Sequence, residues 1–449
     1  MAVSYVLNTP ADQKSMLDAI GAASIAELFE PIPERYRLNR PLNVPASLSE
    51  MELQQHFSGL CKRNISADDA ACFLGGGSYD HFIPAVVDVV SSRSEFYTAY
   101  TPYQPEASQG SLQAFFEFQT MIGQLAGLEI SNASLYEGGS AVAESVLMAM
   151  GIHPDRHKVL VPESLHPEYR LTLTTYLANL DFQVETLPTP RGFLDLEILK
   201  KAIDDKTLCV VVQHPNFFGG LEDVDEIGKL CKEKGALFIV SFDPISVGLL
   251  KRPGDYGADI AVGEGQCLGN PMAYGGPYLG LMACREEFVR KIPGRIVGQT
   301  TDRRGNRCWV LTLQTREQHI RREKATSNIC TNQGLFALRA SAYLAALGPD
   351  GLRETADLCA RKAHYLADEL VKVTGVKLAF ERPFFKEFVI EVPTDPVPLL
   401  EKLLKAGYHA GLPLGRWYPQ MSRAISIAVT EKRTKAEMDG LVTALAANL

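Results

Sequence analysis

The sequence predicts an α/β protein with a large domain built on a mainly parallel sheet and a smaller C-terminal α+β domain. Three observations predict it. Short β-rich runs alternate with helical segments from about residue 106, and these runs are almost continuously apolar, as in a sheet covered on both faces. After about residue 325 the alternation changes to helices followed by isolated strands. A chain of 449 residues is also long enough to divide into a large domain and a small one.

Three regions follow from this pattern. Residues 1–75 are predicted to form short helices and proline-rich connectors, as in "PIPERYRLNRPLNVP". Residues 76–325 are expected to form the large α/β domain, and residues 326–449 the small α+β domain. Internal repeats, low-complexity tracts and long linkers are absent from the sequence, so we expect the domains to pack tightly.

The large domain begins its alternation with the segment "SQGSLQAFFEFQTMIGQLAGL". Phe115, Phe118, Ile122 and Leu125 have helical spacing, and Gly127 ends the helix. The predicted strands are "KVLVP", "FQVETLP", "LCVVVQ" and "ALFIVSF", and the predicted helices between them are "PEYRLTLTTYLANL", "LDLEILKKAI" and "VDEIGKLCKEKG".

The small domain is predicted to begin with helices near residues 333–348 and 352–373. "FKEFVIEVP", a helix near 396–406 and "AISIAVTEK" follow, and an amphipathic helix near 433–447 comes last.

Composition excludes several classes of protein. A formal net charge of −8 disfavours nucleic acids and anionic membranes as partners. The nine cysteines are odd in number and scattered, which fits reduced thiols better than disulfides or a zinc site, and no metal is expected. The N-terminus lacks an apolar signal core and no run is long enough to span a bilayer, so the expected location is the cytoplasm.

Three candidate features fit a pocket for a vitamin B6 cofactor. Gly138, Gly139 and Ser140 in "SLYEGGSAVAE" begin a helix whose free N–H groups suit a phosphate, although an ordinary glycine turn with a serine cap explains them equally well. Asp243 ends an apolar strand and could keep a pyridine nitrogen protonated, or it could simply start a turn. His166 follows another strand and could stack on the ring, or could be a local cap or core residue.

The fourth feature, a lysine that holds the cofactor covalently, is missing. In "DIAVGEGQCLGNPMAYGGP" the residue that stands some way past Asp243 and just before the glycine-rich turn is Gln266. A carboxamide nitrogen is delocalised into its carbonyl and cannot act as the nucleophile. Lys251 lies close to Asp243 but in a surface-turn composition, so we interpret it as solvated.

Long stretches of the chain resemble the glycine cleavage system P-protein family, in particular its separate N-terminal-half (alpha) subunits. The resemblance spans nearly the whole chain and is carried by "FLGGGSYDHFIPAVV", "SRSEFYTAYTPYQPEASQGSLQAFFEFQTMI", "NASLYEGGSAVAE", "PNFFGGLED", "GEGQCLGNPMAYGGPYLG" and "TREQHIRREKATSNICTNQ". It implies the pyridoxal phosphate-dependent transferase fold of the aspartate aminotransferase type (fold type I).

The resemblance also implies a function. The companion (beta) subunit is expected to carry pyridoxal 5'-phosphate on a lysine, with Gln266 opposite that lysine and Gly265 opposite the histidine before it, so that none is covalently bound to this chain. The pair is expected to decarboxylate glycine and to pass the aminomethyl group to the lipoyl arm of the H-protein. Pockets of this fold lie at a dimer seam, so a chain without the lysine can complete its neighbour's site, and an α2β2 assembly is expected.

Two segments are candidates for such a contribution to the partner. The first contains Phe96, Tyr97, Tyr100, Tyr103, Gln104 and Glu106, whose aromatic rings with polar groups suit a partly buried contact. The second is rich in arginine and includes Arg303 and Arg316, which could attract a carboxylate, a phosphate or an acidic carrier domain. The alternatives are a proline-pinned loop that packs on its own domain and a solvated helix face with local Glu pairing.

Two other functions stay open on the sequence. The chain could be an inert scaffold or glycine-responsive regulator of this fold. It could also be an independent B6 enzyme that uses an unexpected lysine.

Overall fold

The computed structural model describes residues 7–325, 327–330 and 332–449. The chain divides into two compact units, Met1–Ser66 and Ala67–Leu449, and each is described by itself. In the first unit, helices α1 (Pro10–Ile20) and α2 (Glu50–Cys61) are joined by a connector with the short 3-10 turns η1 (Glu27–Phe29) and η2 (Glu34–Tyr36).

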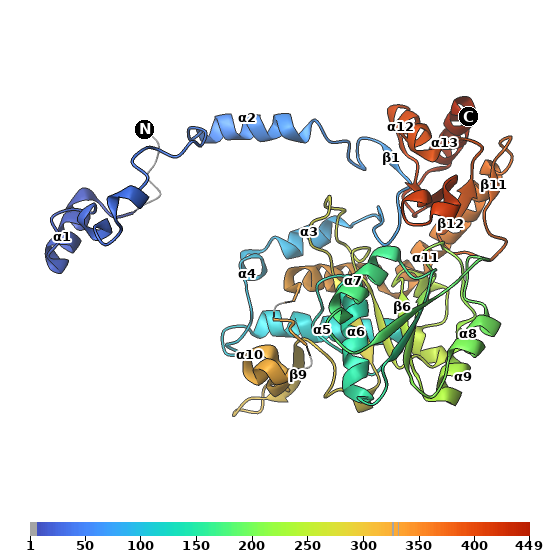
Figure 1. The fold of residues 1–449 in the computed structure, drawn as a ribbon, viewed down its shortest axis with the longest axis horizontal. Helices are drawn as coiled ribbons and strands as arrows, with labels where there is room; N and C mark the ends of the chain where they lie inside the picture. Colours follow the sequence, from blue (N-terminus) through green and yellow to red (C-terminus); the bar gives the residue numbers. More distant parts are fainter. Residues whose placement is uncertain (1–6, 326, 331) are drawn as a thin grey trace. The chain divides into compact units, whose positions relative to one another are not determined.

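The second unit is organised around a seven-stranded sheet with the strand order β2-β8-β7-β6-β5-β3-β4 (Figure 1). Its strands are β2 (Ile130–Ser131), β3 (Lys158–Pro162), β4 (Gln183–Leu187), β5 (Thr207–His214), β6 (Leu237–Phe242), β7 (Ile260–Glu264) and β8 (Gly280–Cys284). The five strands from β7 to β4 run parallel, while β8 and β2 pair antiparallel with their neighbours. The predicted mainly parallel sheet is therefore confirmed.

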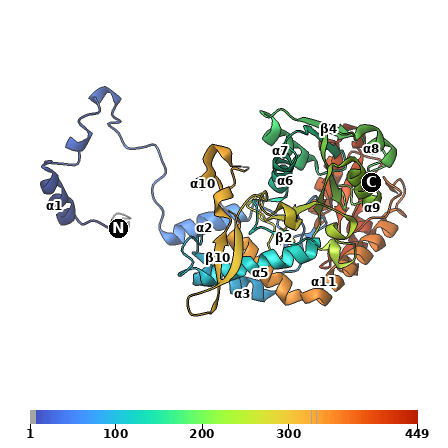
Figure 2. The same ribbon diagram turned by 90° about the horizontal axis from the view of Figure 1, so that it is seen from below.

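Helices cover both faces of this sheet (Figure 2). Val210 and Val212 of β5 pack into a core with α5, α8 and α9, whereas Val211 packs into a second core with α6 and α7. This alternation follows from the two-residue period of a strand and explains why the strands are apolar throughout. The helices are α3 (Ala85–Ser91), α4 (Ser94–Tyr97), α5 (Gln109–Ala126), α6 (Gly138–Ile152), α7 (Pro167–Leu177), α8 (Leu196–Ala202) and α9 (Val224–Lys234).

Helix α5 shows how the sequence encodes these elements. Phe115, Phe118 and Ile122 are buried along one face, as their spacing predicts. Gly127 ends the helix in the left-handed conformation at φ 68°, which glycine adopts without strain.

The C-terminal part begins with the long helix α11 (Gly334–Leu370), which is broken at Gly348 (φ 63°, ψ −176°) just before Pro349. The two helices predicted here are thus the two halves of α11. A four-stranded antiparallel sheet of order β11-β12-β15-β14 packs with two further helices. Its elements are β11 (Lys377–Leu378), β12 (Glu387–Glu391), α12 (Pro396–Lys405), β14 (Leu412–Pro413), β15 (Ala424–Ala428) and α13 (Lys435–Asn448).

Three small features complete the fold. Strand β1 (Ala71–Cys72) pairs with β13 (Tyr408–His409), β9 (Ile296–Thr301) forms an antiparallel hairpin with β10 (Arg307–Thr312), and α10 spans Gln318–Arg321. The sequence analysis did not predict the hairpin, because its polar outer half lacks a strand's alternation. Across the part of the chain that the structure describes, no helix combines the length and the apolar character needed to cross a membrane.

Candidate functional site

The candidate pocket lies where the central parallel strands end. Asp243 follows β6 directly, Glu264 ends β7 and Gln213 lies at the end of β5. In open α/β sheets this edge is where ligands bind. Here these residues, with Tyr79 and Lys386, line a cavity of only about 30 Å³. A pocket for a ligand of cofactor size has a volume of roughly 300–1,000 Å³, so this cavity is about ten times too small.

The predicted phosphate site at the start of α6 holds carboxyl groups of the chain itself, of which the buried Glu264 has its pKa raised to about 8 by burial. Glu137 accepts hydrogen bonds from the N–H groups of Gly139 and Ser140, and Glu264 accepts one from Gly138 at 2.9 Å. These are the N–H groups that a phosphate at a helix N-terminus would use. A Cβ on Gly138 would overlap the Tyr169 hydroxyl, so the glycine admits a tyrosine here. Phosphate binding by Gly138, Gly139 and Ser140 stays a prediction, and it would require both carboxyl groups to leave.

Asp243 forms a buried ion pair with Lys386, a residue that the sequence analysis missed. The Lys386 Nζ atom lies 2.6 Å from Asp243 Oδ2 and 3.5 Å from the centre of the Tyr79 ring. Lys386 is only 1% exposed. Burial is the largest single influence and acts to lower its pKa, but Asp243 and the neighbouring Cys267 and Cys359 together raise the pKa above its ordinary value, so the ammonium group stays charged. A cation of the chain therefore faces the carboxylate that would otherwise face a protonated pyridine ring.

His166 caps helix α7 instead of presenting a free ring face. Its Nδ1 atom accepts the N–H of Glu168 at 3.1 Å, and Nε2 donates to the Gly76 carbonyl at 2.8 Å. The ring stacks on Tyr169 with a centroid distance of 4.3 Å and an interplanar angle of 17°. Burial lowers the pKa of His166 to about 4, so the ring is neutral. The local cap considered for His166 is thus the role that these contacts give it.

Gln266, at the position of the missing lysine, uses every hydrogen-bonding group of its side chain. Its Oε1 accepts the Tyr79 N–H at 2.9 Å, while Nε2 donates to the Tyr79 carbonyl at 3.1 Å and to the Asn270 carbonyl at 2.8 Å. The side chain is buried, with 1% of the residue exposed. An amine has no acceptor in its charged form, so a lysine could not take over the bond from Tyr79 N–H.

The segment Gly76–Phe82 threads between the large sheet and the C-terminal part. On the side of the large sheet, the Gln266 side chain forms hydrogen bonds with the backbone of Tyr79. On the other side Glu387 accepts hydrogen bonds from the Gly76 N–H at 2.7 Å and from the Tyr79 hydroxyl at 2.6 Å.

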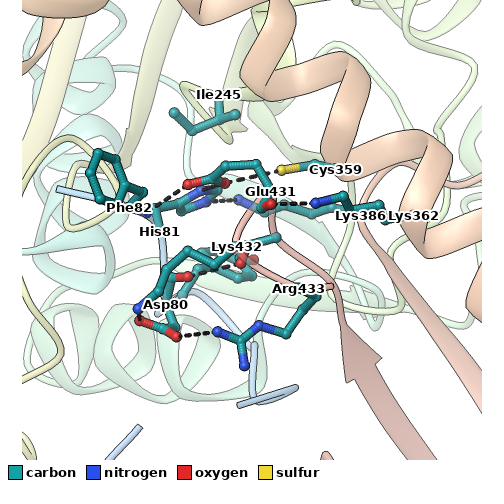
Figure 3. A network of polar contacts seen from close by, with 12 residues as sticks. Asp80, His81, Phe82, Ile245, Cys359, Lys362, Lys386, Glu431, Lys432 and Arg433 are labelled. Atoms are coloured by element: carbon teal, nitrogen blue, oxygen red, sulfur yellow. Dashed lines mark hydrogen bonds and ion pairs between the residues drawn. The ribbon is translucent and has the colours of Figure 1, made fainter. Parts of the chain in front are cut away.

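Charged contacts fasten the same segment to the loop after β15 (Figure 3). Asp80 pairs with Lys432 at 2.7 Å and with Arg433 at 3.0 Å, and His81 Nδ1 lies 2.6 Å from Glu431 Oε2. Polar side chains of this segment therefore join two parts of the fold across the pocket.

His81, Glu431 and Cys359 lie close enough together to resemble a metal site. Lys386 Nζ can only donate and lies 3.1 Å from His81 Nε2, so Nε2 accepts this hydrogen bond. The ring proton is therefore on Nδ1, which donates a hydrogen bond to Glu431. Burial raises the pKa of the Cys359 thiol well above its ordinary value, which keeps it protonated. These atoms satisfy one another as a hydrogen-bond network, and we assign no metal to them.

A pyridoxal phosphate does not fit the residues of this pocket as they are arranged. Carboxyl groups hold the N–H groups of α6, Lys386 neutralises Asp243, and Gln266 offers no nucleophile. A sequence signal for these contacts was present in "FFKEFVIEV", where the charged residues Lys386 and Glu387 stand directly before and at the start of the apolar strand β12. Charged residues are rarely buried unless they are paired.

The aromatic segment proposed for the partner is largely exposed. Tyr97, Tyr100 and Tyr103 expose 66%, 80% and 49% of their surface, and Gln104 and Glu106 are also exposed. Next to them is a groove of about 190 Å³ that extends to the start of α11 and is lined by Phe96, Ala99, Tyr100, Phe115, Gln333 and Leu338 among others. The segment therefore offers both rings and a concave surface.

The two arginine candidates lie in different surroundings. Arg303 is exposed in the β9–β10 hairpin. Arg316 is half-buried and donates to the carbonyls of Leu313, Ile292 and Gly294, so its guanidinium group is used by the backbone. The sequence analysis missed Arg295, which is buried, donates to the Tyr103 hydroxyl at 3.1 Å and lies 3.8 Å from Glu317.

Glu144 provides a test of how burial in this protein changes the pKa of a carboxyl group. Burial raises its pKa to about 7, against an ordinary value of 4.5, and its Oε2 atom has no hydrogen-bond partner among the described residues. The folded protein thus keeps the proton over a pH range where the unfolded chain has lost it, and stability falls as pH rises through that range.

We expect the free energy of unfolding of the wild type, relative to Glu144→Gln, to fall by about 2–3 kcal/mol between pH 4.5 and 7. Urea denaturation at several pH values measures this difference. If the free energy of unfolding varied with pH in the same way for both proteins, the raised pKa of Glu144 would be contradicted.

Comparison with known proteins gives a consistent picture. The family model described as "Glycine cleavage system P-protein" matches residues 3–445. A protein of Carboxydothermus hydrogenoformans called "Probable glycine dehydrogenase (decarboxylating) subunit 1" is 53% identical over 99% of this chain and 99% of its own length. A protein with the same name from Chloroherpeton thalassium is 50% identical over 98% of this chain and 99% of its own length.

Solved structures agree with the fold. The crystal structure of glycine decarboxylase (P-protein) of the glycine cleavage system, in inhibitor-bound form, is similar with a TM-score of 0.93 and 45% identity, covering 100% of both chains. An alanine–glyoxylate aminotransferase from Nostoc sp. has a TM-score of 0.60 at 18% identity, over 92% of this chain and 98% of its own, which shows the fold alone. The predicted pyridoxal phosphate-dependent fold type I is confirmed.

Proposed function

Because the chain belongs to the glycine cleavage system P-protein family, we propose that it acts as the alpha subunit of glycine dehydrogenase (decarboxylating) and is inactive alone. One observation carries the proposal: the carboxamide of Gln266 stands in place of the lysine and all of its hydrogen-bonding groups are used. The family assignment supports this reaction, and the filled pocket supports the proposal of a second, lysine-bearing subunit.

The companion subunit supplies what this chain lacks. We propose that the beta subunit carries pyridoxal 5'-phosphate and binds glycine, and that the aminomethyl group left after decarboxylation passes to the lipoylated H-protein. Two αβ pairs would form an α2β2 assembly. All nine cysteines are free thiols, which fits the reducing cytoplasm as the place of action.

This chain's own contribution is surface that completes the companion's site. The segment from Phe96 to Glu106 is the best candidate, because it exposes large rings that a soluble protein normally covers. Tyrosine rings give apolar contact and keep a hydroxyl for a polar group, as interface anchors do. Arg295 donates a partly buried hydrogen bond to the Tyr103 hydroxyl, so this end of the segment is positioned before any partner binds.

We expect Tyr97→Ala/Tyr100→Ala to reduce glycine–CO2 exchange by the assembled pair at least tenfold. Both side chains are exposed in the isolated chain, so their removal should leave its melting temperature unchanged. Exchange of labelled CO2 into glycine, measured with the pair and H-protein, tests this. Tyr176→Ala on α7 serves as the matched control, because that tyrosine is also partly exposed and lies outside the segment.

The same measurements separate the other functions. If the wild-type pair exchanges CO2 and the double variant keeps full activity and assembly, the segment has no part in the site. An inert scaffold or regulator would leave exchange by the beta subunit unchanged when this chain is omitted. An independent B6 enzyme would yield a pyridoxyl-lysine in this chain after borohydride reduction.

A further inference from the structure

Arg295 is a buried arginine just before β9 that binds two separate segments of the chain. The residue is 2% exposed. Its Nη2 atom donates to the Tyr103 hydroxyl at 3.1 Å and also to the Cys330 carbonyl. The guanidinium carbon lies 5.4 Å from the centre of the Tyr103 ring. One nitrogen of one side chain therefore joins the aromatic segment to the chain that precedes α11.

These two segments lead into the two walls of the groove of about 190 Å³ described above. One wall consists of residues from the range 96–101, and the other of residues from the range 332–338, while α5 completes the lining. Tyr103 comes just after the first wall and Cys330 just before the second. Arg295 therefore fixes the distance between the ends of the two walls.

The second wall and the backbone of Arg295 are held by the same turn of the large domain. The Asn332 side chain donates to the Ala133 carbonyl, and the Gln333 N–H donates to the Ser134 hydroxyl at 3.1 Å. The Ala133 N–H in turn donates to the Arg295 carbonyl at 2.8 Å. The guanidinium group thus starts from a backbone that is fixed relative to the second wall, and it can place the tyrosine of the first wall against it.

The hydrogen bonds of Arg295 differ from those of an ordinary buried ion pair. A buried guanidinium group commonly binds a carboxylate through two parallel hydrogen bonds. Here the Nε atom of Arg295 is 3.8 Å from Glu317 Oε2, which is too long for a hydrogen bond. Among the described residues, Arg295 Nε and Glu317 Oε1 have no hydrogen-bond partner. Glu317 therefore balances the charge, while the terminal nitrogen is used for Tyr103 and Cys330.

We propose that Arg295 is a positioning residue for the companion subunit's site, because it sets the spacing between Tyr103 and the chain at Cys330. This rests on the proposed function, in which the aromatic segment completes that site. Arginine suits the task because its planar guanidinium group is rigid, whereas lysine ends in a single ammonium group on a flexible stem. A displacement of about 1 Å in groups that position a substrate can cost on the order of a hundredfold in rate.

The experiment compares Arg295→Lys with Gln119→Leu in the full chain. Arg295→Lys keeps a positive charge beside Glu317, but its shorter side chain does not reach the two acceptors. Gln119 holds the same strand, since its side chain accepts the Val297 N–H at 2.9 Å and donates to the Val297 carbonyl at 3.0 Å. Gln119→Leu removes these bonds and leaves those of Arg295 in place, so it is the matched control for a loss of stability in β9.

Two measurements are made on each variant. Amide hydrogen exchange of the isolated chain reports how firmly the peptides that contain Tyr103 and Cys330 are held. Glycine–CO2 exchange, with the beta subunit saturated by this chain, gives kcat/KM for glycine. We expect Arg295→Lys to accelerate amide exchange in both peptides and to lower kcat/KM, each by at least about tenfold. Gln119→Leu should lower the melting temperature and leave both quantities unchanged.

Tyr103→Phe, alone and combined with Arg295→Lys, tests whether the arginine acts through the tyrosine. Both changes break the same hydrogen bond, so the double variant should lose no more activity than Arg295→Lys alone. Losses that multiply in the double variant, unchanged amide exchange in Arg295→Lys, or equal losses of kcat/KM in Arg295→Lys and Gln119→Leu overturn the inference. A wild-type pair that exchanges no CO2 contradicts the proposed function itself, and amide exchange of the isolated chain then still decides whether Arg295 positions the two segments.

Discussion

Replacement of Lys386 by methionine is expected to lower the free energy of unfolding of the isolated chain by about 3–5 kcal/mol, since it leaves a buried carboxylate without its cation. Asp243 has its Oδ2 atom 2.6 Å from the lysine nitrogen, and its other oxygen accepts the Ile245 N–H, so no second cation compensates in these contacts. His81 and the Tyr79 ring lose a contact as well. Urea denaturation at neutral pH measures the effect.

A double-variant cycle keeps this prediction specific. Asp243→Asn alone should also be destabilising, because it leaves the ammonium group unpaired. Lys386→Met/Asp243→Asn removes both charges and should recover much of the lost stability, since replacing a buried ion pair by neutral groups is often close to neutral. If the destabilisation of the double variant equalled the sum of the two single destabilisations, the Lys386–Asp243 ion pair would not explain the loss of stability.

We expect that a lysine introduced by Gln266→Lys does not enable this chain to bind the cofactor covalently. The side chain leaves the Tyr79 N–H without its acceptor and brings a charge into a site that is 1% exposed. Each unsatisfied buried group costs about 1–3 kcal/mol and a buried charge costs more. We expect a loss of at least about 3 kcal/mol in stability and no pyridoxyl group fixed to this chain by borohydride.

Gln183→Lys is the matched control for this variant. Gln183 lies exposed at the start of β4, so the same chemical change there should alter stability by less than about 0.5 kcal/mol. If Gln266→Lys folded with wild-type stability and retained the cofactor after reduction, the pocket would be open and the account of a filled pocket would be wrong.

Together these two variants test whether side chains of the chain take the places of a cofactor's charged groups. A pyridoxal phosphate in a pocket of this kind would contribute an anion at the helix N-terminus and a cation opposite the aspartate. Here the side chain of Glu137 takes the place of the anion and Lys386 supplies the cation. Burial raises the pKa of Glu264 to about 8, so its carboxyl group accepts the Gly138 N–H in largely protonated form at neutral pH. Side chains of the chain itself thus occupy the positions where charged groups of such a cofactor would lie.

Much of the large domain could be predicted from local pattern. The helix of Phe115, Phe118 and Ile122 was found from its period and its end from Gly127, and the parallel strands were found from their continuous apolar runs. The break in α11 was visible because Gly348 and Pro349 interrupt the helical pattern. The β9–β10 hairpin was missed, because the outer half of β9 is polar throughout and lacks the alternation of a half-buried strand.

Only part of the candidate site could be predicted from local sequence pattern. Asp243, Gln266 and the glycines of α6 were located because each follows a strand or starts a helix. Their partners Lys386, Glu264 and Tyr79 were not found, although they decide what the pocket can hold. Arg316 was considered for an anion, but its donors point to backbone carbonyls.

The fold class, the pattern of helices and strands, the family resemblance and the absence of an amine at position 266 all follow from the order of the residues. These are properties of residue order and of short-range periodicity, and they can be read without coordinates. The filling of the pocket, in contrast, becomes apparent from the folded chain alone. Lys386 meets His81 across 305 positions of sequence and Gln266 meets Tyr79 across 187, and contacts at such separations depend on how the elements pack, which local pattern does not specify.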